Sequence, residues 1–363
     1  MGFGKKFFLL VITGLLINTI AILANEPKTS EAAEGEKSTE EKFNPGEFIF
    51  EHIGDAYGWH VFTYKHEPYS IPLPVILYSK NSGFHVFMST KFHHGRTSYG
   101  GFKIALEGKY KGKVVEITSN ETYVRPLDIS ITKNTASLIV SLLLIMWIFL
   151  SVAARYKRNP DKAPSGLQSF VEPLILFVRD DIAKPSIGHK YEKYMPYLLS
   201  IFFFIWINNM LGLIPFPPGG ANLTGNIAIT MSLAVFTFVI TTFSGNKNYW
   251  LHIFNPPGVP WWLKLPIPLI PFIEFVGMFI KPFVLMVRLF ANIAAGHVIA
   301  LGFFSLIFIF GAMKVWAGFA VTPLSIAFTF FMALLELLVA FIQAYVFTLL
   351  SALYFGMAVE EHH

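Results

Sequence analysis

The stretch IEFVGMFIKPFVLMVRLFANIAAGHVIALGFFSLIFIF, residues 273–310, determines the fold class of this chain. It is almost entirely apolar and far longer than the ~20 residues that cross a bilayer. Its most unusual residue is Arg288, a permanent cation that costs at least about 2.5–3.5 kcal/mol at mid-bilayer. Such an arginine usually faces a water-filled cavity, a carboxylate or a moving partner. The structural alternatives are an arginine that reaches the interface and one that closes an ion pair.

The composition of the whole chain is that of a protein that crosses a membrane several times. Of its 363 residues, 54% are hydrophobic and only 14% are charged. A soluble domain carries about 25% charged residues, so a globular soluble protein is excluded. The formal charge of +5 mostly reflects loops on one side of the membrane, and we expect no nucleic-acid partner. The absence of cysteine excludes disulfides, thiolate metal sites and cysteine nucleophiles.

The first 130 residues have a different character. Residues 1–24 contain the lysines, apolar core and small final residue of a secretory signal peptide. An uncleaved membrane anchor is the alternative, and in both cases the following residues are exported. Residues 25–42 are small, polar and acid-rich, and we expect a disordered tether there. Residues 43–130 contain short alternating apolar segments between Gly, Pro and Asn, which predict a small β-rich exported domain.

Histidines are frequent in this expected domain, but no pair has a spacing that specifies a metal site. There are six of them: His52, His60, His66, His85, His93 and His94. We expect surface or structural histidines here, and we expect no metal and no cofactor. The residues of the domain assign it no chemistry.

Residues 131–363 are expected to form the transmembrane domain, an all-α fold with about five membrane-inserted helices. Three apolar stretches have the length of a single span: 136–154, 197–214 and 227–243. Two further stretches, at about 270–311 and 318–357, are much longer. Each is either two short helices or one long, steeply tilted helix, and the connector between them suits a tight hairpin.

The orientation of the chain follows from the charges beside the first span. Four basic residues come after it: Arg155, Lys157, Arg158 and Lys162. The positive-inside rule therefore places the end of this span in the cytoplasm, and five spans place the C-terminus there too. Residues 165–184 have apolar side chains at helical spacing and charges at their end, which predicts an amphipathic helix on the cytoplasmic interface.

Polar residues recur along the first long stretch. Glu274, Arg288 and Asn292 share one helix face, because 14 and 4 positions separate them. If this helix runs outward, Arg288 lies about 21 Å beyond Glu274, and His297 about 13 Å further, at ~1.5 Å per residue. The stretch therefore carries a carboxylate, a cation and an imidazole at three different depths.

The second long stretch contributes Glu336 and Gln343, seven positions apart and so on one face. In an antiparallel hairpin Glu336 meets His297 in the outer half, and Gln343 meets Arg288 near the middle. His titrates near neutrality, and desolvation can bring a Glu toward the same range, so these groups are typical of a proton relay. Polar side chains that bond helices together are the alternative, which explains a single amide better than the whole set.

Two segments carry a family resemblance. KPFVLMVRLFANIAAGHVI (281–299) and ELLVAFIQAYVFTLLSALYFGMAVEEH (336–362) resemble the a subunit of the membrane sector of rotary F-type ATP synthases. The R-L-F-x-N-x-x-A-G block and the later Q-A-Y-V-F block are together highly specific. The resemblance extends more weakly over residues 126–363. There, LDISITKN (127–134) resembles the approach to that subunit's first membrane helix, and NNMLGLIP (208–215) the end of its third.

The resemblance implies roles for the polar residues. Arg288 would face the proton-binding carboxylates of a rotating ring of c subunits, and Glu274 falls on an inner half-channel position. The positions associated with the outer half-channel and the arginine neighbourhood are Asn292, His297, Glu336 and Gln343. Some bacterial members carry an acid and a histidine at the positions of His297 and Glu336, the reverse of this chain. The exported domain is longer than the N-terminal segment common in the family.

The function expected from this resemblance is that of a non-catalytic stator subunit. It offers two proton half-channels to the ring and couples proton flow to ATP synthesis in a bacterial inner membrane. Its implied partners are the c ring, the b-subunit peripheral stalk, the remaining synthase subunits and membrane lipid. ATP chemistry belongs to other subunits, since the chain has no GxxxxGK[ST] loop.

Two other functions remain as alternatives. A secondary ion-coupled transporter, gated by a pair of Arg288 with a carboxylate, predicts internal repeats, and none is evident. An intramembrane enzyme lacks its motifs, because the spans contain no HExxH, no GxSxG and no paired aspartates.

Overall fold

A computed structural model describes residues 53–64, 67–80, 82–95, 97–106, 108–117, 123–158, 163–214, 219–254 and 269–360, and single positions 46, 49 and 217. The expected signal peptide (1–24) and tether (25–42) lie outside these residues. The described residues belong to two compact units. The first holds the β strands, the start of helix α3 up to Val140, and segments 211–221 and 308–318; the second holds the remaining helical residues.

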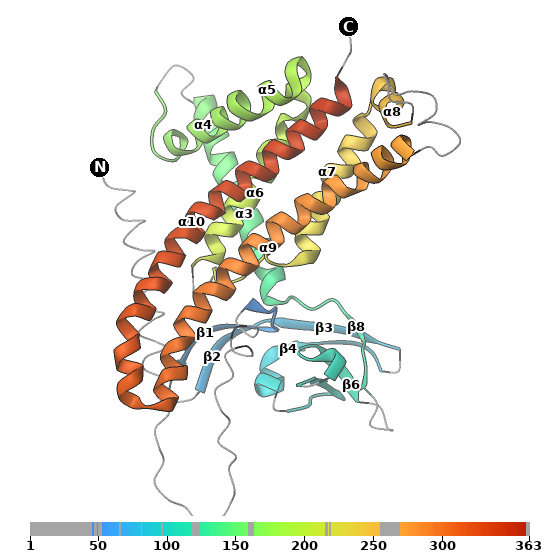
Figure 1. Cartoon of the computed structure of the whole chain (residues 1–363). Coiled ribbons are helices and arrows are strands. Elements are labelled where there is room, and N and C mark those ends of the chain that lie inside the picture. Colours follow the sequence, from blue (N-terminus) through green and yellow to red (C-terminus); the bar gives the residue numbers. More distant parts are fainter. Residues whose placement is uncertain are drawn as a thin grey trace, which may run out of the picture. The chain divides into compact units, whose positions relative to one another are not determined.

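The N-terminal region is β-rich, as expected (Figure 1). Within the described residues it consists of three small sheets whose neighbouring strands are all antiparallel. The strands are β1 (Gly58–Tyr64), β2 (Glu67–Pro72), β3 (Pro74–Ser79), β4 (Gly83–Met88), β5 (Phe102–Ile104), β6 (Val114–Ile117), β7 (Tyr123–Val124) and β8 (Leu127–Asp128). The sheets have the orders β1-β2, β4-β3-β8 and β5-β6-β7. Two short 3-10 helices, η1 (Ser89–Gly95) and η2 (Gly108–Tyr110), lie between the strands.

The core of this region follows from the alternation along β3. Val75 and Leu77 are fully buried on one face of the strand, as a period of two residues requires. They pack with the buried side chains Phe92 of η1, Phe102 of β5 and Val114 of β6. One face of the β4-β3-β8 sheet is thus covered by the rest of the region.

Helix α3 (Lys133–Arg158) begins directly on the β-rich region. A side-chain oxygen of Asp55 accepts a hydrogen bond from the backbone N–H of Asn134 at 3.0 Å, and the carbonyl of Ala56 accepts one from Lys133 at 2.8 Å. Two N–H groups that a helix N-terminus leaves unpaired are therefore satisfied by residues from before the first strand. Nearby, Tyr57 donates to Asp128, and burial together with this bond raises the pKa of Tyr57.

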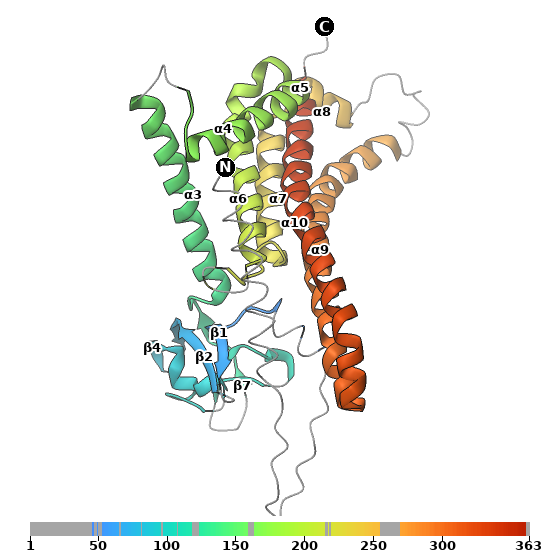
Figure 2. The same cartoon turned by 90° about the vertical axis from the view of Figure 1, so that its left-hand side faces the viewer.

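The second unit is helical and is seen from the side in Figure 2. Its complete elements are α4 (Leu167–Phe177), a π-helical turn η3 (Val178–Ala183), α5 (Lys184–Ile187), η4 (Gly188–Lys190), α7 (Ile227–Ser244) and α8 (Lys247–Phe254). It also holds most of α3, of α6 (Tyr191–Gly212), of α9 (Leu269–Met313) and of α10 (Val315–Val359). Large aromatic and aliphatic side chains from α6, α9 and α10 form its core, among them Phe202, Leu289 and Phe355.

Five helical segments of the described residues are long and apolar enough to cross a membrane. They are Lys133–Arg158, Leu167–Gly212, Ile227–Ser244, Ile270–Met313 and Val315–Val359. A mostly helical, multi-pass membrane protein with five such segments is therefore confirmed. The segment Leu167–Gly212 is about twice the length of one span, and it contains the residues for which an amphipathic helix was expected. Gly188, with φ of 72°, ends α5 and turns the chain toward α6.

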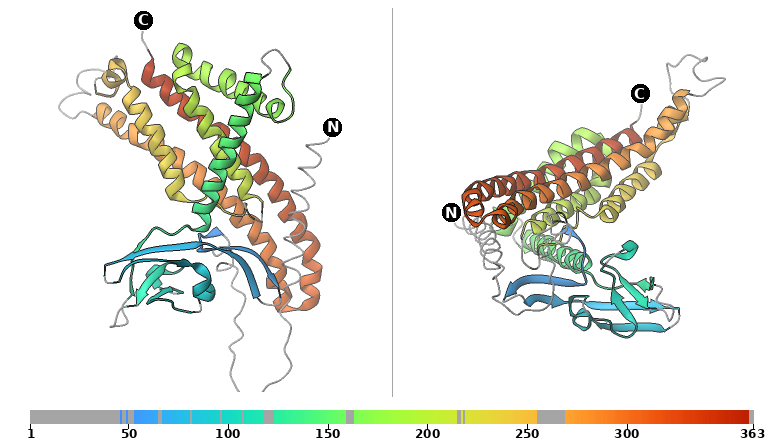
Figure 3. Two further views of the ribbon diagram at one scale, coloured as in Figure 1. Left: turned by 180° about the vertical axis from the view of Figure 1, so that it is seen from behind. Right: turned by 60° about the horizontal axis from the view of Figure 1, so that its bottom comes forward.

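The two longest apolar stretches are each one continuous helix of 45 residues. Sequence alone left open whether each would break into two, and the internal residues Pro282 and Pro323 do not break them. α9 and α10 run side by side as an antiparallel pair (Figures 1 and 3). The Phe303 and Phe328 rings stack at 5.1 Å, and the Ser325 hydroxyl donates to the carbonyl of Phe303.

Candidate functional site

His297 of α9 and Glu336 of α10 form a direct contact. His297 Nδ1 lies 3.0 Å from Glu336 Oε1, and both side chains are mostly buried, with 18% and 13% of their surface exposed. The expected pairing of these two residues is thus present in the structure. The contact holds an imidazole and a carboxyl group within the distance over which a proton passes along a hydrogen bond.

Gly296, next to His297 on α9, leaves space for the Glu336 carboxyl group of this pair. A Cβ atom at Gly296 would lie 2.6 Å from Glu336 Oε1, closer than real Cβ contacts allow. A side chain at this position would therefore push the Glu336 carboxyl group away from where it is. The glycine next to His297 on α9 thus leaves room for the Glu336 carboxyl group in its present position.

Arg288 lies on the side of α9 that carries Lys281, within electrostatic range of Tyr354 of α10. Its side chain is exposed, and it makes no hydrogen bond or ion pair with any residue that the structure describes. Val284, one turn earlier on the same face, is exposed and apolar, and so are Phe283 and Val287 on either side of that face. A permanent charge among exposed apolar side chains is costly in a membrane unless it faces water or a polar or charged partner.

The remaining predicted residues are distributed along both helices. Asn292 lies one turn beyond Arg288 and is exposed on the same face, whereas Glu274 is half-buried. Gln343 is buried, with 5% of its surface exposed. No hydrogen bond joins it to Arg288, since the Gln343 side chain is buried and the Arg288 side chain is exposed. That the two residues share one depth stays a prediction; beside Arg288, Leu285 and Leu289 are buried in the core.

A second set of polar groups, which the sequence reasoning missed, adjoins α10. The Asn209 side chain of α6 donates to the carbonyl of Ala340 at 3.1 Å, and the Thr224 hydroxyl donates to the Asn209 side-chain oxygen. Ala340 lies one turn beyond Glu336 on α10. Nearby polar atoms of Asn208 (Oδ1) and Asn222 (Nδ2) are buried without a hydrogen-bond partner in the described part of the chain. Buried amides of this kind require water or another polar partner.

The sequence did contain a signal for this set. Two adjacent asparagines close the apolar stretch 197–214, and the segment ANLTGN (221–226) follows soon after. Amides inside an otherwise apolar span are costly unless they are paired, so they mark a polar site.

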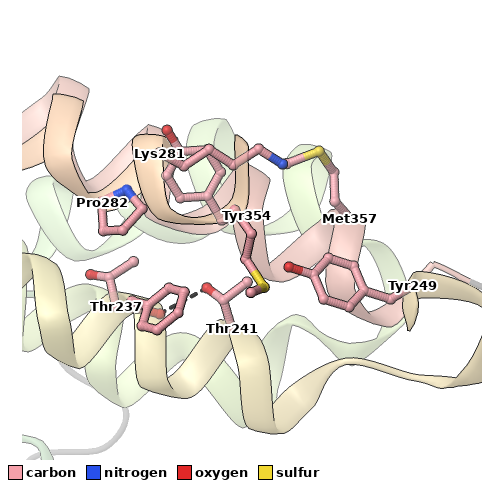
Figure 4. Close-up of a pocket in the computed structure, with 9 residues that line it drawn as sticks. Thr237, Thr241, Tyr249, Lys281, Pro282, Tyr354 and Met357 are labelled. Atoms are coloured by element: carbon pink, nitrogen blue, oxygen red, sulfur yellow. Dashed lines mark hydrogen bonds between the residues drawn. The ribbon is translucent and has the colours of Figure 1, made fainter. Parts of the chain in front are cut away.

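A pocket lies between α7, α9 and α10, with Tyr249 of α8 at its side (Figure 4). Lys281 of α9 lines it, with its ammonium group 5.8 Å from the centre of the Tyr354 ring. Thr237 and Thr241 of α7 line it from below in this view. Lys281 lies two turns beyond Glu274 and two turns before Arg288, on the same side of α9. The pocket is therefore on the Glu274 side of Arg288, away from His297.

Comparison with known sequences identifies relatives of the helical part. A model of the family described as "ATP synthase A chain" matches residues 135–356. A second model, described as a domain of unknown function, matches residues 48–132. The first match contains every residue of α9 and α10 that was considered above, and the second coincides with the β-rich region.

Individual relatives carry the same description. "ATP synthase subunit a" of Chloroherpeton thalassium is 41% identical over 244 residues, which are 65% of this chain and 69% of that protein. "ATP synthase subunit a 2" of Chlorobaculum tepidum is 46% identical over 244 residues, 66% of each chain. "ATP synthase subunit a" of Chlorobium phaeobacteroides is 43% identical over 255 residues, 68% of this chain and 71% of the relative. The similarity covers about two thirds of each chain.

Proposed function

The chain belongs to the ATP synthase A chain family, and from this premise we propose that the polar residues of α9 and α10 line two proton half-channels, one on either side of Arg288. The outer one contains His297 and Glu336, and the inner one contains Glu274. Asn292 and Gln343 complete the surroundings of the arginine.

Family membership fixes the general role. The chain is a non-catalytic, proton-translocating subunit of the membrane sector of an F-type ATP synthase, where it belongs to the stator. It works with other subunits of that synthase, including the c ring, and ATP chemistry takes place on other subunits. A secondary transporter that acts alone is not favoured by this membership.

The arrangement in the membrane is part of the proposal. Residues 1–24 are a signal peptide, 25–42 a tether, 43–130 an exported domain and 131–363 the transmembrane proton-channel domain. The C-terminus lies in the cytoplasm of a bacterial cell, and support for this comes from the basic last turn of α3. α4 and α5 lie on the cytoplasmic interface, where the exposed ion pairs of Asp180 with Arg179 (2.8 Å) and Lys184 (2.7 Å) meet water.

Protons enter from outside through the cleft at His297 and Glu336, and a carboxylate of the c ring takes them up. The neutral acid can then travel through lipid, where a carboxylate could not. After nearly a full turn it reaches the inner cleft near Glu274 and releases its proton. Each elementary charge that crosses 100 mV supplies about 2.3 kcal/mol for this rotation.

Arg288 separates the two clefts. Its fixed positive charge attracts the ring carboxylate that has lost its proton, and it repels a proton that would pass directly between the clefts. The observation that carries this role is its exposed position among apolar side chains, without a hydrogen bond or ion pair to any of the described residues. The long helix pair α9 and α10, held at a steep tilt, presents this face to the ring. The b-subunit peripheral stalk and membrane lipid contact other surfaces of the chain.

Replacement of Arg288 tests the proposal. Arg288→Ala removes both the attraction for the ring carboxylate and the barrier between the clefts. We expect ATP-driven acidification of membrane vesicles to be lost, passive proton leak to persist or rise, and the complex to assemble. Arg288→Lys should restore little, because an ammonium group lacks the planar fork and can lose its proton on burial. Lys314→Ala, which removes a cation at the hairpin turn, is the matched control and should pump normally. Substantial pumping by the Ala variant would overturn the mechanism.

A further inference from the structure

The β4-β3-β8 sheet has one face that its own core does not cover. Val75, Leu77 and Asp128 face inward, so the residues that alternate with them point the other way. Six large apolar side chains on this second face are between 43% and 65% exposed; this outer apolar face consists of Tyr78, Phe84, Val86, Met88, Leu127 and Ile129. Single exposed apolar residues are ordinary, but a contiguous group marks a surface that contacts something.

Strand register makes this face continuous. Tyr78 is directly opposite Phe84 on one side and Leu127 on the other, and Val86 is opposite Ile76. The Ile129 N–H also bonds to the carbonyl of Ile76 at 2.9 Å, which extends the face beyond the end of β8. Side chains at opposite positions of an antiparallel pair lie about 4.5–5.5 Å apart, so these residues form one patch across three strands.

The outer apolar face is fixed beside the start of the first membrane-spanning helix. Ile129 precedes the first residue of α3 by only four positions, and Asp55 and Ala56 hold the first turn of α3 on the same region. In Figures 1 and 3, β3 and β8 lie between the base of α3 and the layer that contains β6. Because the core lies on the β6 side, the outer apolar face is on the side of the sheet where α3 begins.

The residues around this face have the chemistry of a membrane interface. Lys80 and Arg125 are both exposed, and they follow Tyr78 and precede Leu127 at one end of the patch. Tyrosine is enriched at the headgroup level, where its ring is in apolar surroundings and its hydroxyl in polar ones. Basic side chains beside an apolar patch can contact lipid phosphates. On α3 itself, Ile139 and Leu143 are exposed apolar residues that continue toward the bilayer.

We propose that the outer apolar face rests on the lipid headgroup and acyl-chain boundary of the membrane that α3 enters. The proposal rests on the proposed function, since it requires an exported domain on a membrane-inserted chain. The domain then lies on the surface of the outer leaflet. Its contact with lipid and the bonds at the base of α3 together fix the position of the first helix.

Fluorescence quenching by spin-labelled lipids tests this contact directly. The chain has no cysteine, so single cysteines can be introduced and labelled with an environment-sensitive fluorophore. Val86→Cys and Met88→Cys report on the outer apolar face. Lys91→Cys is the matched control, because it is exposed on η1, which packs on the opposite face of the sheet through Phe92. Leu143→Cys, on an exposed position of α3, reports whether the chain spans the bilayer.

The purified complex is reconstituted into phosphatidylcholine vesicles that contain lipids with a doxyl group near the headgroup or deep in the acyl chain. We expect the headgroup-proximal doxyl lipid to quench positions 86 and 88 several-fold more than position 91. Equal quenching at 86, 88 and 91, with position 143 quenched by the deep doxyl lipid, would overturn lipid docking and leave the proposed function intact. Protection of position 86 from aqueous iodide without lipid quenching would identify a protein partner and also overturn it. If position 143 is not quenched, the chain does not span the bilayer and the proposed function fails.

Discussion

His297 Nδ1 and Glu336 Oε1 lie 3.0 Å apart although 39 positions of sequence separate the two residues. The contact fixes the relative depth of α9 and α10, since each residue rises about 1.5 Å along a helix. It also places the imidazole and the carboxyl group where one can donate a proton to the other. Loss of either partner changes the other, and this coupling can be measured.

The first prediction concerns this coupling. His297→Ala and Glu336→Ala should each slow proton entry, and the double variant should be little worse than either single one. Residues in contact show coupling free energies of about 0.5–3 kcal/mol. Proton flux into vesicles under an imposed gradient gives the rate. Strictly additive effects would assign the two residues to separate sites. The exchange His297→Glu with Glu336→His should retain more flux than either deletion, because it keeps one acid and one imidazole.

The second prediction uses the glycine beside the pair. Gly296→Ala should reduce proton flux because the new methyl group displaces the Glu336 carboxyl group from its position. Gly302→Ala lies on the same helix with no atom within 4 Å of its Cβ position and is the matched control. The two variants gain the same helix propensity, so a difference between them reports on the pair alone. Equal flux in both would show that the position of the Glu336 carboxyl group does not limit proton entry.

The third prediction concerns the amide of Asn209. Asn209→Ala leaves the Thr224 hydroxyl without its acceptor and the Ala340 carbonyl without its side-chain donor, both in buried surroundings. Loss of a buried partner costs about 1–3 kcal/mol, so the complex should dissociate at lower temperature or detergent concentration. We also expect slower proton entry, because Ala340 is one turn from Glu336. Ser200→Ala, which removes an exposed hydroxyl from the same helix, is the control. Normal stability and flux in Asn209→Ala would assign no role to this polar set.

The fourth prediction is the topology. A cysteine at Glu360 should react with a membrane-impermeant maleimide only from the cytoplasmic side, and one at Lys109 only from the outside. Both sites are exposed or lie at a helix end, so access is decided by the membrane and not by burial. Labelling at position 360 only from the outside would reverse the orientation proposed here.

The pairing of His297 with Glu336 could be predicted because helical spacing gives depth. A tight turn joins the two helices, so residues that are equally far from the turn along each helix lie at the same depth. The same argument paired Arg288 with Gln343 in depth, but no hydrogen bond joins these two side chains. Spacing gives depth but not the rotation of a helix about its axis. That rotation follows from packing, in which Leu285 and Leu289 are buried and Arg288 is exposed.

The polar set around Asn209 could not be assembled from spacing. Asn209 and Ala340 are 131 positions apart, and no periodic pattern relates α6 to α10. In the β-rich region, alternation predicted where strands would form, but not their division into three sheets. That division depends on which strands pair, and the pairs β3 with β8 and β6 with β7 join segments whose short strands carry little pattern.

The bond from Asn134 to Asp55 has a consequence for how the chain is made. Asp55 is synthesised 79 positions before Asn134, so it has already left the ribosome when the first spanning helix is translated. It can cap that helix only after the intervening strands have brought it back to the same place. A substitution that prevents these strands from folding would therefore leave the start of the helix uncapped. The complete cap at the first turn of the membrane part thus depends on the fold of the β-rich part.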